Sequence, residues 1–271
     1  MKKLTANLLI ASTILGSIVA PIVKAEEGET QKPAKEVDTT AKVEFKANDE
    51  GETTPVDPTD PQNPEIVDPE NPGGQGGGKG ALRIDWAPHF NFGENKIQGG
   101  GDFVINATHD EGSPHYFVQV SDLRGLNADW KLNVTASPLK RKDKDEQLLG
   151  SYITFTPGTV LNDSVDQEAH LPEYKGVKFA ATKIDLGTKE GKENESQTLI
   201  NAQSEQTPQG TWSLAMETET HKDKNQTEDV TLTIPVSQIK KIRKDIYQAT
   251  LQWELLSDIS ADIKGLLPVA K

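Results

Sequence analysis

The sequence predicts an all-β fold, a single β-sandwich-like domain that follows a disordered, acidic, Pro/Gly-rich N-terminal region. Short segments with alternating apolar and polar residues recur through residues 81–271, as in strands with one buried face. Charged, turn-forming segments such as KRKDKDEQ separate them, and no long segment has the apolar spacing of a helix. Many short strands with such connections favour a sandwich or a barrel.

The first 25 residues have the features of a secretory signal peptide. Lys2 and Lys3 precede an apolar run over residues 8–22, and Val23-Lys24-Ala25 follows it. Polar residues interrupt the run and it is short for a membrane span, so we expect cleavage after Ala25 rather than an uncleaved anchor. The mature chain would carry 26 basic and 42 acidic groups, a net charge of −16, which argues against nonspecific nucleic-acid binding.

Two segments separate the signal peptide from the predicted domain. Residues 26–54 are rich in Glu, Lys and Thr, and we expect them to be mostly disordered. Residues 55–80 form a linker in which prolines recur mostly every third residue, which predicts a stiff polyproline II spacer rather than a Pro-rich ligand. The run GGQGGGKG after it predicts a flexible joint. Residues 81–271 then form one domain with a net charge of −7.

The chain contains no cysteine. Disulfides, thiol catalysis and zinc-thiolate sites are therefore excluded, and the domain depends on its core for stability. An exported chain of this kind suits the outside of a Gram-positive cell.

Nine segments have strand patterns. The first five are ALRIDW (81–86), YFVQV (116–120), WKLNV (130–134), YITFTP (152–157) and VKFAA (177–181). The other four are QTLIN (197–201), WSLAM (212–216), VTLTIPV (230–236) and YQATLQWELL (247–256). One helix of one or two turns is predicted over residues 236–246, where isoleucines recur at helical spacing before the last strand.

Two of these strands carry a Trp-x-Leu motif. Residues two apart share a face of a strand, so the large apolar residues of each strand project together, and polar residues occupy the other face. In the first strand the apolar set is Trp130, Leu132 and Val134. In the last strand it is Tyr247, Ala249, Leu251, Trp253 and Leu255. A third Trp-x-Leu begins at Trp212.

Two separated Trp-x-Leu strands, a signal peptide and an acidic proline spacer resemble the WxL family of Gram-positive surface proteins. The segment YFVQVSDLRGLNADWKLNV is similar to the first family signature, with an Asp-x-Arg-Gly turn before the Trp strand. The last strand matches the second signature at Tyr247, Leu251, Trp253 and Leu255. Gln252 stands where Thr is usual and Ile259 where Pro would end the strand, which leaves the geometry of the last turn open.

The resemblance implies a secreted, non-catalytic domain that attaches noncovalently to the cell wall, with peptidoglycan or another wall polymer as receptor and no cofactor. It also implies an association with membrane- or wall-anchored partner proteins. The alternative function is therefore docking on such a partner, and binding to host matrix as an adhesin is kept beside it. The motif residues are the candidate wall-binding residues: Trp130, Leu132, Tyr247, Leu251, Trp253 and Leu255. Strand tryptophans flanked by leucine are usually buried, so we expect Trp130 and Trp253 to be mainly structural, with stacking on sugars as the functional alternative.

No other pattern indicates catalysis or metal binding. Acidic residues are abundant, but no pair is singled out as in a glycoside hydrolase. The segment HDEGSPH (109–115) lacks the spacing of a helical zinc motif, and the segment from Asp223 lacks the glycine and bidentate glutamate of a calcium loop. The basic cluster at residues 240–244 is expected to be solvated, with an anionic wall polymer or an acidic partner as the alternative. The terminal LPVAK lacks the elements of a covalent sorting signal.

Overall fold

The computed structural model describes residues 40–49, 51, 55, 58, 74–76, 78–109, 115–126, 128–162, 176–187, 195–203, 209–218 and 226–258. The predicted signal peptide, most of the predicted disordered segment and proline spacer, and the terminal LPVAK lie outside these residues. Of the calcium-loop-like segment, residues 223–225 lie outside them, and residues 226–234 form a strand. All described strands belong to the unit Glu44–Lys271. Among the described residues, no helix has the length and apolar character needed to cross a membrane.

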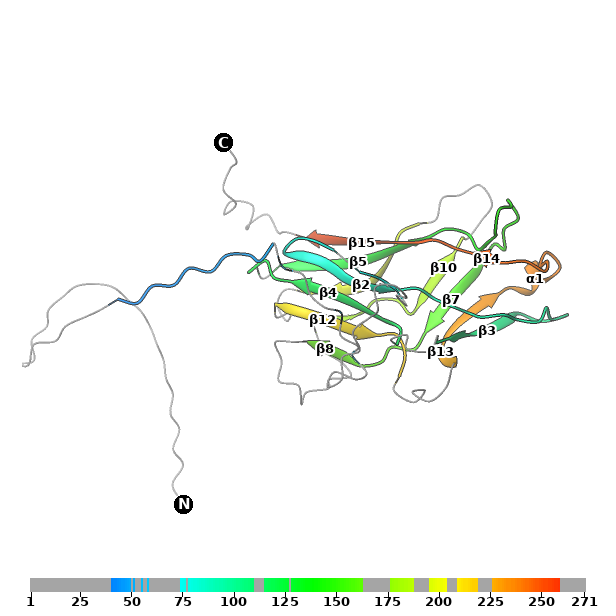
Figure 1. The fold of residues 1–271 in the computed structure, drawn as a ribbon, viewed down its shortest axis with the longest axis horizontal. Helices are drawn as coiled ribbons and strands as arrows, with labels where there is room; N and C mark the ends of the chain where they lie inside the picture. The colour runs from blue at the N-terminus through cyan, green and yellow to red at the C-terminus, as the bar shows by residue number, and fades with distance from the viewer. Residues whose placement is uncertain are drawn as a thin grey trace, which may run out of the picture. The chain divides into compact units, whose positions relative to one another are not determined.

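The all-β prediction is confirmed, because the described elements are fifteen strands and one helical turn (Figure 1). Sheet A has the order β1-β2-β4-β12-β8, with bounds Gly74–Gly76, Leu82–Pro88, Phe117–Asp122, Gly210–Ala215 and Val160–Asn162. Sheet B has the order β10-β7-β13-β3, with bounds Lys183–Leu186, Ser151–Phe155, Gln226–Ile234 and Phe103–Thr108. Sheet C has the order β15-β5-β11-β9, with bounds Leu251–Asp258, Asp129–Ala136, Gln197–Ala202 and Val177–Phe179. A small fourth sheet pairs β14 (Tyr247–Gln248) with β6 (Lys140–Arg141).

One hydrophobic core receives side chains from all three large sheets. Val120 and Trp212 come from sheet A, Ile153 from sheet B, and Leu132 and Ile200 from sheet C. The alternation read in the sequence produces this arrangement, because every second residue of β5 is buried. β4 and β12 differ from the simple pattern, since both of their faces are buried.

The second face of sheet A buries a polar network. The Oγ of Ser121 donates to Oδ2 of Asp85 at 2.6 Å, and Nε of Arg83 donates to Oδ1 of the same carboxylate at 2.8 Å. The Oγ of Ser213 donates to the side chain of Gln119 at 2.9 Å. Desolvation raises the pKa of Asp85, although the hydrogen bond from Ser121 and the charge of Arg83 oppose the shift.

The glycine run differs from the predicted flexible joint. Gly74–Gly76 form β1 and pair antiparallel with residues 86–88 of β2. A Cβ on Gly74 would lie 2.3 Å from the carbonyl oxygen of Ala87 and 2.5 Å from the Trp86 ring, so only glycine fits there. β1 therefore extends sheet A into the region assigned to the linker. The strands β3, β6, β8 and β10 were also absent from the predicted set.

The last predicted strand is two strands. β14 ends at Gln248 and β15 begins at Leu251, whereas the sequence predicted one continuous strand. At the break, the N–H of Ser137 donates to the carbonyl of Thr250 at 2.8 Å, and the N–H of Thr250 donates to Oγ of Ser137 at 2.8 Å. These two hydrogen bonds lie where the C-terminal segment stops pairing with β6 and begins to pair with β5. The predicted helix is the one-turn α1 (Val236–Ile239), which buries Ile239.

Candidate functional site

The two Trp-x-Leu strands are neighbours in sheet C (Figure 1). β15 pairs antiparallel with β5 along its whole length, and Leu255 lies directly opposite Leu132. Trp253 is opposite Val134, and Trp130 is opposite Ser257. Residues directly opposite each other in an antiparallel pair share a face, so both motifs project toward the same side of the sheet. That side is the core.

Trp130 and Leu132 fill the core. Both side chains are 0% exposed, and the indole Nε1 of Trp130 has no hydrogen-bond partner among the described residues. A side chain without access to solvent does not stack on a sugar. The burial expected for Trp130 is thus present in the structure, and its mainly structural role stays a prediction.

The motif residues near the C-terminal strand are less buried. Tyr247, Leu251, Trp253 and Leu255 are all half-buried and pack against the same core. β15 is the edge strand of sheet C, so its side chains lie at the margin of the core rather than in its middle. The third motif tryptophan, Trp212, lies in sheet A and is 0% exposed.

The opposite face of the motif strands is polar and faces solvent. We call it the outer face; on β5 and β15 it comprises Lys131, Asn133, Thr135, Gln252 and Glu254. Thr135 is opposite Gln252, and Asn133 is opposite Glu254. β11 adds Thr198 beside Asn133 and Asn201 beside Lys131. Side chains of this face are about 4.8 Å apart across the strands and about 6.8 Å apart along them.

The polar groups of the outer face are not used within the described part of the domain. Lys131, Gln252 and Glu254 are exposed and take part in no hydrogen bond or ion pair there. The side-chain oxygen Oδ1 of Asn133 is shielded from solvent and has no hydrogen-bond partner. Elsewhere on the surface, charged side chains such as Lys183 and Asp185 pair with each other. The outer face thus presents free donors and acceptors on a rigid sheet.

The Asp-x-Arg-Gly turn of the first signature ties sheet A to the end of the motif strands. The guanidinium of Arg124 donates from Nη2 to Oδ2 of Asp122 at 2.7 Å and to the carbonyl of Ala128 at 3.0 Å. Its Nη1 also donates to the Oγ of Ser257 on β15. Gly125 has a φ of 69°, a conformation that favours glycine. The signature therefore encodes a clamp that fixes β15 relative to β4.

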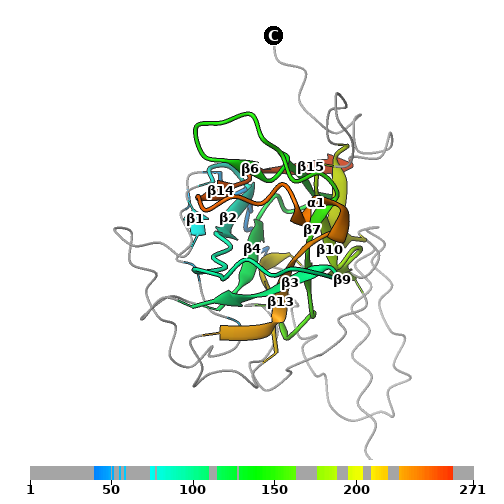
Figure 2. The same ribbon diagram turned by 90° about the vertical axis from the view of Figure 1, so that its right-hand side faces the viewer.

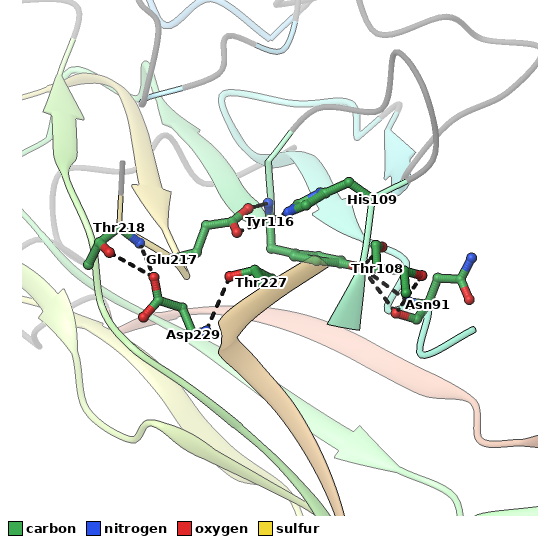
Figure 3. Close-up of polar contacts among 8 residues, drawn as sticks. All are labelled: Asn91, Thr108, His109, Tyr116, Glu217, Thr218, Thr227 and Asp229. Atoms are coloured by element: carbon green, nitrogen blue, oxygen red, sulfur yellow. Dashed lines mark hydrogen bonds and ion pairs between the residues drawn. The ribbon is translucent and has the colours of Figure 1, made fainter. Parts of the chain in front are cut away.

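A second polar cluster surrounds Glu217 (Figure 3). The buried carboxylate accepts the backbone N–H of Tyr116 at 2.7 Å through Oε1 and lies 3.0 Å from Nε2 of His109 through Oε2. Asp229 accepts the N–H and hydroxyl of Thr218 at 2.8 and 2.7 Å. Each carboxylate is occupied by groups that fix the chain. Among the residues that the structure describes, no three His, Cys, Asp or Glu side chains are grouped to hold a metal ion.

Sequence reasoning selected the apolar half of the site. It identified all six motif residues, and all six pack in or against the hydrophobic core. Five lie on the neighbouring strands β5 and β15 of sheet C, and Tyr247 lies on β14 of the fourth sheet. The alternation also placed polar residues such as Lys131, Asn133 and Gln252 on the opposite face, where the sequence predicted only a supporting role for them beside stacked tryptophan rings. The exposure and the free hydrogen-bonding groups became visible only once the neighbouring strands were known.

Comparison with known proteins agrees with this geometry. The model of the family described as "WxL domain surface cell wall-binding" matches residues 32–258, which include the described segment 40–49 and both motif strands. No curated protein and no solved structure matches the chain. The matched family places the protein at the cell surface, with attachment to the cell wall as its function. The chain belongs to the WxL family of cell-wall-binding surface domains.

Proposed function

We propose that this domain attaches noncovalently to peptidoglycan through the outer face of sheet C, and that it catalyses no reaction. The supporting observation is that the two faces of the motif strands carry different kinds of side chain. Their tryptophans and leucines pack inward, while the opposite face carries free polar groups. The motif then acts indirectly, because its buried side chains keep β5 and β15 in register and so fix the positions of the polar residues on the outer face.

Peptidoglycan suits the chemistry of this face. Its sugars present hydroxyl and acetamido groups, and its stem peptides present amides, carboxylates and amines. Gln252 supplies an amide donor and acceptor, Lys131 supplies an ammonium group, and Glu254 supplies a carboxylate, and all three side chains are exposed. Each exposed contact contributes little by itself, so we expect affinity to come from many contacts to a polymer.

Co-sedimentation of the full chain with peptidoglycan stripped of proteins and anionic polymers tests the proposal. Saturable pelleting is expected, and after prolonged incubation the supernatant is expected to contain no released sugar or peptide fragments. Absence of pelleting would disprove direct attachment, and released fragments would disprove the non-catalytic assignment.

A charge-matched pair of variants tests the outer face. The double variant Lys131→Ala/Glu254→Ala is expected to weaken binding at least tenfold, which corresponds to about 1.4 kcal/mol. The control, Lys96→Ala/Glu228→Ala, changes two exposed charged residues outside sheet C and is expected to bind as the unmodified chain does. Equal binding by both variants would move the site away from the outer face.

One observation favours a protein partner as the second candidate. Leu256, which lies opposite Lys131, is 43% exposed and is the large apolar residue of this polar face. A membrane- or wall-anchored protein or a host-matrix protein could bury it. Because the chain has no cysteine, Gln252→Cys gives a single attachment point for a photo-cross-linker. On intact cells, cross-linking to one defined protein supports this candidate, and cross-linking to wall polymer alone contradicts it.

A further inference from the structure

Two basic segments far apart in the sequence meet at the small fourth sheet. β6 pairs antiparallel with β14, so that Arg141 lies opposite Tyr247. The N–H of Lys142 also donates to the carbonyl of Ile246 at 2.8 Å. This ladder joins the hairpin at residues 140–146 to the turn at residues 240–245, and we call the two together the basic end. Figure 2 shows β6, β14 and α1 in the same part of the domain.

The basic end has the opposite charge to the rest of the domain. Residues 140–146 and 240–245 contain eight basic and four acidic side chains, a net charge of +4. Residues 81–271 as a whole carry −7, so the remainder carries −11. Sequence reading found only the 240–244 cluster, because the second half of the basic end arrives through strand pairing.

Most of these positive charges are not neutralised. Arg141 is occupied by Asp245 at 2.6 Å and by Glu146 at 3.2 Å, and Nζ of Lys140 lies 3.9 Å from Asp145. Six basic side chains form no ion pair among the described residues, and all six are exposed: Lys142, Lys144, Lys240, Lys241, Arg243 and Lys244. A cluster of unpaired like charges raises the free energy of the protein unless anions gather at it.

The backbone holds the charges together. The ion pair between Arg141 and Asp245 bridges the two segments, and the N–H of Arg243 donates to the hydroxyl of Tyr247 at 2.9 Å. Hydrogen bonding from Arg141 lowers the pKa of Asp245, with the Ile246 N–H and the charge of Lys144 adding to the effect. The buried Ile239 fixes the turn to the core. The two segments that carry the basic side chains are therefore held next to each other.

We propose that the basic end binds a chain of phosphodiester groups, such as an anionic polymer of the cell wall, separately from the peptidoglycan site. Lysine binds phosphate as a compact, hydrated point charge, and Arg243 adds a planar donor. The six groups are exposed on two short segments, so each phosphate is held weakly. A polymer that engages several of them at once gains affinity that a single phosphate ion does not.

Binding of the full chain to immobilised poly(glycerol phosphate) tests this proposal. The variant Lys142→Gln/Lys144→Gln/Lys240→Gln/Lys241→Gln removes four charges from the basic end. The control, Lys42→Gln/Lys46→Gln/Lys96→Gln/Lys178→Gln, removes four exposed charges elsewhere and leaves the same net charge. We expect the first variant to bind at least tenfold more weakly and the control to stay within about twofold of the unmodified chain. Equal loss in both variants, or no binding by the unmodified chain, overturns the proposal.

Two further measurements sharpen the test. Asp143→Asn removes an exposed acid that has no partner among the described residues, so it is expected to strengthen binding. Binding should weaken as salt rises, since the screening length falls to about 10 Å at 0.1 M. Stronger binding to phosphatidylglycerol vesicles than to the polymer would overturn the proposal in favour of a membrane surface. Pelleting with phosphate-free peptidoglycan should be unchanged in the four-lysine variant, which separates this site from the proposed function.

Discussion

Trp130→Phe separates the architectural role of the motif from wall binding. Trp130 is fully buried, and its indole N–H has no partner in the part of the chain that the structure describes, so there the indole contributes apolar contacts and no hydrogen bond. Phenylalanine keeps a ring in the same place and removes the polar atom. Trp130→Ala removes the ring as well and serves as the destabilised reference.

The magnitude follows from three contributions. A loss of roughly 40 Å² of apolar area costs about 1 kcal/mol. A residual cavity of roughly 40 Å³ costs about 1 kcal/mol more. Removing a buried, unpaired N–H returns about 1–3 kcal/mol. We therefore expect the unfolding free energy of Trp130→Phe to lie within about 1 kcal/mol of the unmodified chain, whereas Trp130→Ala loses about 3–5 kcal/mol.

Guanidinium unfolding followed by far-ultraviolet circular dichroism measures these differences, because the backbone signal does not depend on the substituted ring. Folded Trp130→Phe should also pellet with peptidoglycan as the unmodified chain does. A loss of about 3 kcal/mol or more in Trp130→Phe would show that the indole N–H is satisfied, contrary to the structure. Loss of pelleting in a fully folded variant would show that Trp130 takes part in binding.

Three further outcomes follow from buried contacts described above. Gly74→Val should lower the unfolding free energy by about 1–3 kcal/mol, because its Cβ would collide with the Trp86 ring. Gly99→Ala, whose Cβ would meet nothing within 4 Å, should change the unfolding free energy by less than about 0.5 kcal/mol. Equal losses in the two variants would refute the role of β1. Glu217→Ala should cost about 1–3 kcal/mol in thermal or denaturant unfolding, since it leaves a buried backbone N–H without its acceptor; an unchanged midpoint would contradict this. Burial raises the pKa of Asp85 above 3.8, so its contribution to stability is complete below pH 3.8 and is lost as pH rises through the higher folded-state pKa. Over that interval the unmodified chain should lose stability relative to Asp85→Asn. Parallel pH profiles of the two proteins would contradict the shift.

The sequence predicted the fold class and the motif strands because alternation is a local signal. The spacing alone predicts a buried strand face at Trp130, Leu132 and Val134. β1 was missed because three residues of a glycine run carry no alternation, and its pairing depends on β2 leaving room over Trp86. The split between β14 and β15 was missed because Ala249 continues the apolar pattern while a hydrogen bond to Ser137 redirects the backbone.

The candidate site was predictable to a similar depth. The apolar motif residues come from the pattern and the family resemblance, but their neighbours come from the pairing of strands that are more than a hundred residues apart in sequence. The basic end shows the same limit, since no local pattern relates Lys142 to Lys244. The residue types in each segment could be interpreted from the sequence, but which segments lie beside each other depends on the sheet topology.

The pairing of β15 with β5 also bears on how the chain acquires its structure. β5 is made early, but sheet C lacks its edge until residues 251–258 have emerged, and their contacts with β5 span more than a hundred residues of sequence. Such high contact order predicts slow folding, because sheet C cannot be completed before residues 251–258 are available. The core beneath the outer face would thus be completed only when β15 pairs with β5.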